Sequence, residues 1–124
     1  MVALGKFDEA IEYFEKSKQL IDDQYQRVAL LSDTAVAYSQ KASRISTVDQ
    51  KEAAPYFTIA NEHYQQSTTL DPSYPHSWRN WGWSLYREGR YAEAWEKAKK
   101  ARSLGDAFVP KLIEKLSQKM PEPQ

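Results

Sequence analysis

The stretch GKFDEAIEYFEKSKQL at residues 5–20 returns in altered form as GRYAEAWEKAKKARSL at residues 89–104. The offset between these two copies is 84 residues, as from Phe7 to Tyr91. A weaker third copy begins at Phe57, 50 residues after the first and 34 before the last. Self-similarity at a period near 34 is typical of helical repeat proteins, in which stacked repeats share one continuous core.

The composition agrees with an all-helical chain. Only four Gly and six Pro occur in 124 residues, while Ala, Glu, Lys, Leu and Gln are abundant. Lys plus Arg and Asp plus Glu both number 17, so no global field favours nucleic acid or a membrane surface. Cysteine is absent, which excludes disulfides. Because the charges balance, we expect no nucleic-acid partner. We also expect no membrane association, because no run of 18 apolar residues is present.

Apolar periodicity and turn residues predict six helices. We expect them at about residues 8–20, 24–41, 55–69, 75–88, 91–103 and 109–119. Asp22 and Asp23 end the first and offer a cap to the second. Pro75 fits the first turn of the fourth helix, and Gly89 and Gly105 are suited to left-handed positions after helix ends.

The region between the second and third helices gives mixed signals. The polar residues 42–46 indicate a loop, and Thr47–Gln50 fits a capping box that begins a short helix. Pro55 follows about two turns later, where we expect a kink or a break. From the middle repeat to the last, the first helices are offset by 47 residues and the second helices by 34. The two halves of the middle repeat therefore stand 13 residues further apart than those of the last repeat. We therefore predict a longer hairpin with its surplus at residues 42–54; the alternative is a floppy loop between ordinary helices.

The motifs of the last and middle repeats resemble the tetratricopeptide repeat (TPR) family. The family pattern is large-x2-Leu-Gly-x2-Tyr on a first helix and Ala-x3-large on a second, often with Asp-Pro at the end. The last repeat has Trp78-x2-Trp81-Gly82-x2-Leu85 and then Tyr91-x2-Ala94-x3-Ala98. The middle repeat has Leu31-x2-Thr34-Ala35-x2-Tyr38, then Ala60-x3-Tyr64 and Asp71-Pro72. The first repeat keeps only its second helix. The resemblance covers about residues 3–106.

This resemblance implies an all-α, TPR-type α-solenoid of stacked antiparallel helix hairpins with a C-terminal solvating helix. We expect one domain over residues 1–120. It comprises a partial repeat (1–22), an expanded repeat (23–72), a repeat (73–106) and a capping helix (107–120). Residues 121–124, which contain two prolines, are expected to form a disordered tail.

The resemblance also implies a non-enzymatic interaction module that binds a peptide or partner protein in a concave groove lined by the first helix of each repeat. Transfer of that groove to this chain selects one set of residues on the fourth helix and one on the second: His76, Arg79, Asn80, Trp83, Tyr86 and Arg87, and Ser32, Val36 and Ser39. Trp83 between two arginines favours an acidic or aromatic peptide. The alternative is that these side chains only coat a helix.

Other functions lack a framed site. His63 and His76 stand in no metal-binding motif, no nucleophile elbow or phosphate loop occurs, and we expect no cofactor, no metal and no catalysis. The chaperone-tail clamp of some TPR proteins has only Arg79 and Asn80 as counterparts.

The second hypothesis is an assembly element that acts through the N-terminal end or the convex face, including a homodimer through that end. The end lacks a first helix. Phe7, Ile11 and Phe14 can cover the second helix, but Val2, Leu4 and the outer side of the first predicted helix then remain uncovered, and exposed apolar ends of repeat arrays find partners. The start of the chain is too quickly polar for a secretory signal, so a cytoplasmic location is the default expectation.

Overall fold

The chain is all-helical over residues 4–18 and 23–124, which a computed structural model describes. Six helices follow one another with no strand between them in these ranges: α1 (Leu4–Lys18), α2 (Gln24–Ser46), α3 (Gln50–Leu70), α4 (Pro75–Glu88), α5 (Tyr91–Ser103) and α6 (Val109–Ser117). The expected all-α class is confirmed. Leu20, with which the predicted first helix ends, lies outside the described residues.

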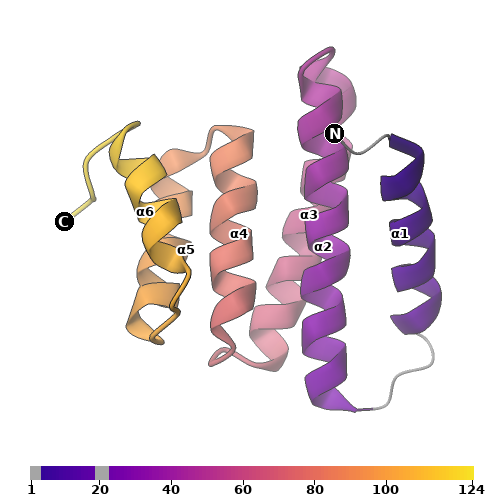
Figure 1. Ribbon diagram of the computed structural model, residues 1–124, viewed down its shortest axis with the longest axis horizontal. Coiled ribbons are helices and arrows are strands. Elements are labelled where there is room, and N and C mark those ends of the chain that lie inside the picture. The colour runs from indigo at the N-terminus through magenta and orange to yellow at the C-terminus, as the bar shows by residue number, and fades with distance from the viewer. Residues whose placement is uncertain (1–3, 19–22) are drawn as a thin grey trace.

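The helices form two rows. Figure 1 shows α2, α4 and α6 toward the viewer, α3 and α5 behind them, and α1 beside α2 at the end of the molecule. Contacts run between α2 and α4 and between α4 and α6 in the front row, and α3 and α5 each touch the front helices on both sides of them. α1 contacts α2 as α3 contacts α4. The front face of α2 therefore lies between α1 and α4.

Helix ends follow the local sequence signals. Asp23 caps α2, since its carboxylate accepts a hydrogen bond from the Gln26 N–H at 3.1 Å. Pro75 occupies the first position of α4, and Gly89 ends that helix with a φ of 84° that favours glycine. The predicted bounds of α4 and α5 are confirmed at both ends. α6 ends at Ser117, two residues before the prediction, a difference within the scatter of helix termini.

At the tip of the α2–α3 hairpin the structure is helical further along the chain than the local sequence predicts, and two local expectations there are wrong. Residues 42–46 belong to α2 and do not form a loop. Thr47 is the C-cap of α2, and its hydroxyl donates to the Arg44 carbonyl. Asp49 is the N-cap of α3 and accepts from the Lys51 and Glu52 N–H groups, so no capping box starts at Thr47. The expectation of a lengthened hairpin is confirmed by helices of 23 and 21 residues, against 14 and 13 in the α4–α5 hairpin.

Pro55 lies inside α3 and does not break it. Proline has no N–H to donate to the carbonyl of Lys51, and both residues are exposed, so water can solvate that carbonyl. Packing on the opposite side of the hairpin offsets the lost bond. Ala42, Ala53 and Phe57 form a buried cluster there, with Ile45 and Tyr56 against it. Burial of this cluster overrides the local preference of the sequence.

The main core joins α4, α5 and α6. Leu85, Trp95, Leu112 and Leu116 are 0–1% exposed, and the small residues of α5 are buried among them. Gly82 lies where a Cβ would stand 2.6 Å from Leu112 Cδ2. Glycine at this position thus makes room for α6 as well as for α5. A second cluster of Ala35, Ala60 and Tyr64, with Trp81 packed on it, connects the two hairpins.

Residues 121–124 are non-helical and make defined contacts with α5. The Arg102 guanidinium donates to the Glu122 carboxylate at 2.7 and 3.0 Å, and the Lys99 ammonium donates to the Pro123 carbonyl at 3.2 Å. The segment expected to be disordered therefore has polar partners on the neighbouring helix. Within the described residues, no helix combines the length and the apolarity needed to cross a membrane.

Candidate functional site

The front of α2 carries a groove between α1 and α4, formed by two adjoining hollows. One, of about 280 Å³, is the α1–α2 groove and is lined by Ala10, Phe14, Asp33, Val36, Ala37 and Gln40. The other, of about 230 Å³, is lined by Phe7, Gln40, Ser43, Arg44 and Arg87. Gln40 belongs to both hollows, so they form one strip that we call the front groove. It lies on the face where the sequence predicts a binding site.

Two of the predicted groove residues are buried under α4. Ser32 is 2% exposed and Ser39 is fully buried. Their hydroxyl oxygens accept hydrogen bonds from Asn80 Nδ2 at 3.3 Å and from Arg87 Nη1 at 3.4 Å. Small side chains let α2 and α4 approach each other at these points. Both serines position α4 side chains and cannot touch a ligand, which corrects their expected place in the groove wall.

Arg79 is engaged within the fold. Its Nη1 donates to both carboxylate oxygens of Asp106, at 2.9 and 3.2 Å, and the Asp106 side chain is 1% exposed. The guanidinium also lies over the exposed Phe108 ring, 5.3 Å from its centre. The guanidinium that was expected to act beside Trp83 is therefore already paired with Asp106. A cation that neutralises a buried carboxylate is held in place and holds the start of α6 against α4.

Trp83 and Arg87 lie together on α4. Trp83 is half-buried against the main core, makes an edge contact with Tyr86, and lies under the Arg87 guanidinium at 6.0 Å. Arg87 as a whole residue is exposed, but its charged end reaches to the buried Ser39. Burial of that end lowers the pKa of the guanidinium. Arg87 forms no ion pair with any described residue. It is thus a partly desolvated cation without a counter-charge in the part of the chain that the structure describes.

The remaining predicted residues differ in accessibility. Val36 is half-buried and lines the α1–α2 groove. His76 is half-buried near the start of α4, where its ring meets Tyr74 edge-on and its Nδ1 is buried without a hydrogen-bond partner among the described residues. Tyr86 is half-buried between Trp83 and Tyr91. Asn80 is half-buried through its bond to Ser32.

Asp33 is a groove residue that the sequence prediction missed. It is exposed and forms no ion pair with any described residue, yet partial burial raises the pKa of its carboxyl above the ordinary value. A signal for it exists in the sequence, because Asp33 stands 47 residues before Asn80, the same offset that relates Val36 to Trp83. The same offset from Arg79 gives Ser32, which the sequence prediction selected instead.

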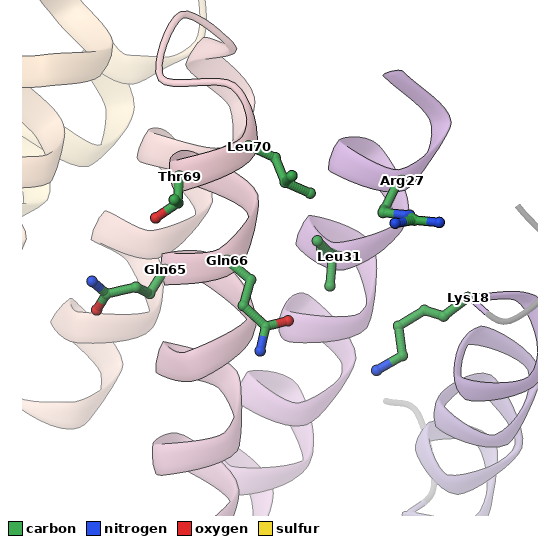
Figure 2. Close-up of a pocket in the computed structure, with 7 residues that line it drawn as sticks. All are labelled: Lys18, Arg27, Leu31, Gln65, Gln66, Thr69 and Leu70. Carbon is green, nitrogen blue, oxygen red and sulfur yellow. The ribbon is translucent and has the colours of Figure 1, made fainter. Parts of the chain in front are cut away.

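A hollow of about 620 Å³ lies away from the front groove. Figure 2 shows Lys18 of α1 extending toward Leu31 of α2, with Gln66 and Leu70 of α3 on the far side. The Lys18 ammonium is engaged, since it bonds the Glu15 carboxylate and the His63 ring at 3.0 Å each. Residues 19–22, which follow Lys18, lie outside the described residues.

The chemistry available at the front groove is that of binding. The charged and amide groups that line it are the Asp33 carboxylate, the Gln40 amide and the guanidinium groups of Arg44 and Arg87. Groups of three or more His, Cys, Asp or Glu side chains arranged to hold a metal ion are absent from the described ranges 4–18 and 23–124.

A scan against protein-family models finds no model that matches this chain. A search of curated proteins finds no match either.

Proposed function

We propose that the chain is a TPR-like α-solenoid module that binds a peptide or partner protein in the front groove and catalyses no reaction. The three sequence copies and the resemblance of their motifs to the TPR family support this assignment. The two rows of helices agree with it, since the first helices of the two repeats, α2 and α4, contact each other and α6 contacts α4.

The observation that carries the proposal is the Trp83–Arg87 pair. The guanidinium is desolvated, has no counter-charge among the described residues, and lies over a half-buried indole beside an open hollow. An acidic group of a ligand would supply the missing charge at little further desolvation cost. Tryptophan and arginine are also the residue types that contribute most to binding energies at interfaces.

The ligand that fits is a segment with a carboxylate next to an aromatic or apolar side chain. The carboxylate would pair with Arg87, and the apolar group would pack on the open part of Trp83 or on Val36. This retains the expectation of an acidic or aromatic peptide but restricts the charged contact, expected from both Arg79 and Arg87, to Arg87.

A peptide array that varies acidic and aromatic positions tests the proposal, with the best-bound sequence then measured by calorimetry. Trp83→Ala and Arg87→Gln should each weaken binding by about 1–3 kcal/mol, as truncation of an interface anchor does. Arg90→Gln is the matched control, because Arg90 follows the end of α4 and its guanidinium is already paired with Glu88 and Glu93. Equal binding by wild type, Trp83→Ala and Arg87→Gln would refute the groove.

Arg79 is less suited to this test. Its removal would leave the Asp106 carboxylate buried and unpaired, which destabilises a fold strongly. A loss of binding by Arg79→Ala could then report unfolding. Arg87 has no buried counter-charge, so Arg87→Gln separates binding from stability.

The second candidate function is assembly through α1. The observation that favours it is the partial exposure of Ala10, Ile11, Phe14 and Ser17, which form one stripe along that helix.

A further inference from the structure

The same repeat positions are buried in α3 and α5 and open in α1. In α5, Ala94, Ala98 and Ala101 are fully buried. Their counterparts in α3, at offsets of 34 residues, are fully buried too: Ala60, Tyr64 and Ser67. The counterparts in α1, at an offset of 84 residues from α5, remain partly exposed: Ala10, Phe14 and Ser17.

The difference arises from the helix in front. α4 covers α5, and a Cβ at Gly82 would stand 3.5 Å from the Ala94 carbonyl oxygen and 3.6 Å from the Ala98 nitrogen. α2 covers α3 in the same way, with Ala35 and Ala60 in one buried cluster. No helix of the described residues occupies the equivalent place in front of α1.

The contacts between α2 and α4 show which side chains reach across such a place. Asn80 and Arg87 of α4 reach back to Ser32 and Ser39 of the preceding front helix. The residues of α2 that stand 47 positions earlier are Asp33 and Gln40. Both line the α1–α2 groove together with Ala10 and Phe14, so they are placed to reach across to a further front helix.

We propose that the α1–α2 groove is the docking site for one amphipathic α-helix of a partner protein, with a small residue packed on Ala10 and Phe14 and a cationic residue paired with Asp33. The helix takes the place in front of α1 that α4 takes in front of α5. This surface adjoins the hollow of Arg87 through Gln40 but does not include the Trp83–Arg87 pair, so the proposal stands if peptide binding at that pair fails.

The chemistry of the partner follows from two substitutions between the repeats. Asn80 of α4 donates to a serine, whereas Asp33 only accepts when ionised, so its partner must be a donor and best a cation. Phe14 replaces Ala98, so the docked helix needs a small residue in the place of Gly82. The raised pKa of Asp33, caused by partial burial, agrees with a carboxylate that lacks its counter-charge.

The chain itself contains a suitable probe. A synthetic peptide of residues 74–89 has the sequence of α4, including the small Gly82, and its Arg79 is the counterpart of Ser32 at the 47-residue offset. Docked in front of α1, it would place Arg79 opposite Asp33. We expect saturable binding of the labelled peptide to the intact protein, measured by fluorescence anisotropy, with a Kd of about 1 mM or tighter.

A charge swap tests the contact. Asp33→Arg in the protein, or Arg79→Glu in the peptide, should each weaken binding roughly tenfold, because two like charges then face each other. The two changes combined should restore binding. Glu114→Arg is the matched control, since it makes the same charge change at an exposed position on α6. Asp33 is exposed, so its replacement leaves the fold intact, which circular dichroism checks.

The outcomes are distinct. Binding by the Trp83→Ala protein at wild-type strength would support a docking surface separate from the Trp83–Arg87 pair. The proposal is overturned by an absence of binding at about 1 mM peptide, or by wild-type affinity in Asp33→Arg. It is also overturned if light scattering shows self-association of the chain that Asp33→Arg abolishes, because the occupant would then be a second copy.

Discussion

Gly82 is the residue at which three helices depend on one missing methyl group. The position lies on α4 and faces Leu112 of α6 and the backbone of α5. A Cβ on this residue would meet α5 at 3.5 and 3.6 Å, which are ordinary contacts, whereas its distance of 2.6 Å to Leu112 Cδ2 is not. The absence of a side chain therefore serves the packing of α6 most of all.

Replacement of Gly82 by alanine should destabilise the chain by about 1–3 kcal/mol through overpacking. The added Cβ forces Leu112 out of its place, and the higher helix propensity of alanine offsets only about 1 kcal/mol of that cost. Chemical denaturation measures the change. Leu112→Ala removes the side chain that the new Cβ would meet. The double variant should therefore lose less stability than the two single variants lose in sum, and strictly additive losses would contradict the clash.

Asp33 should make stability depend on pH in an unusual direction. Its folded-state pKa is raised, so the folded state holds the proton more tightly than the unfolded state does. The resulting penalty is absent below the ordinary pKa of 3.8, grows as the pH rises through the raised pKa, and is complete above it. Asp33→Asn should therefore be more stable than wild type at neutral pH by about 0.5 kcal/mol or less, because water screens this partly exposed group.

Thermal melts of both proteins across the acid range check this expectation. The advantage of Asp33→Asn should disappear below pH 3.8. Glu114→Gln, which removes one carboxylate from the exposed surface of α6, controls for the change in net charge. An advantage that persists unchanged at low pH would assign the effect to something other than the proton on Asp33.

At the scale of the element, the sequence predicted those helices that end in strong turn residues. α4 and α5 have their predicted bounds because Pro75 and Gly89 act locally, through a fixed φ and a left-handed φ. The longer hairpin at residues 42–54 was predicted from the repeat offsets, but the loop at residues 42–46 and the break at Pro55 are wrong, because Ser43, Ser46 and Pro55 favour a loop locally. Burial of Ala42 and Phe57 decides otherwise, and such packing is visible only after the two helices are placed side by side.

The candidate site was predictable to a similar extent. The repeat offset located the face shared by α2 and α4, and it brought Arg87 to the front groove. It did not show that Ser39 is covered, because burial depends on how closely two helices approach. The Arg79–Asp106 pair was also missed. It joins α4 to the turn before α6, where no repeat exists to supply a pattern.

Pro55→Ala should stabilise α3 by about 1–2 kcal/mol. The new N–H can donate to the Lys51 carbonyl, and the ring no longer presses on the preceding turn. Greater freedom of the unfolded chain removes up to about 1 kcal/mol of that gain. A higher thermal midpoint checks the expectation. Thr58→Ala, one turn further along on the same exposed side, is the control. A thermal midpoint of Pro55→Ala below that of wild type would contradict the prediction.

α1 should exchange its backbone amide hydrogens faster than α5 does. The two helices match in sequence, but only α5 is covered by a front helix. Local opening costs less where fewer apolar groups leave a buried place. Hydrogen exchange followed by mass spectrometry measures both helices in one sample, and equal protection of α1 and α5 would contradict this prediction. The peptide of residues 74–89 should slow exchange in α1 alone.

At the scale of the whole molecule, unfolding should proceed from one end. All four tryptophans, Trp78, Trp81, Trp83 and Trp95, lie in α4 and α5, whereas circular dichroism reports every helix. Because stacked repeats contact only their neighbours, the open α1 end should unfold at a lower urea concentration than the α4–α6 core. We expect the fluorescence midpoint to exceed the circular dichroism midpoint. Coincident transitions would show instead that the molecule unfolds as one cooperative unit.

The extended tip of the α2–α3 hairpin has a consequence for how such a chain can vary. Figure 1 shows the tip projecting past the ends of the other helices, and its core of Ala42, Ala53 and Phe57 is separate from the clusters that join the hairpins. Insertions or deletions that retain pairing within the tip leave the contacts between hairpins unaltered. Hairpin length is therefore a dimension in which the molecule can diverge freely, and the tip is the place to graft a tag, a fluorophore or a foreign epitope.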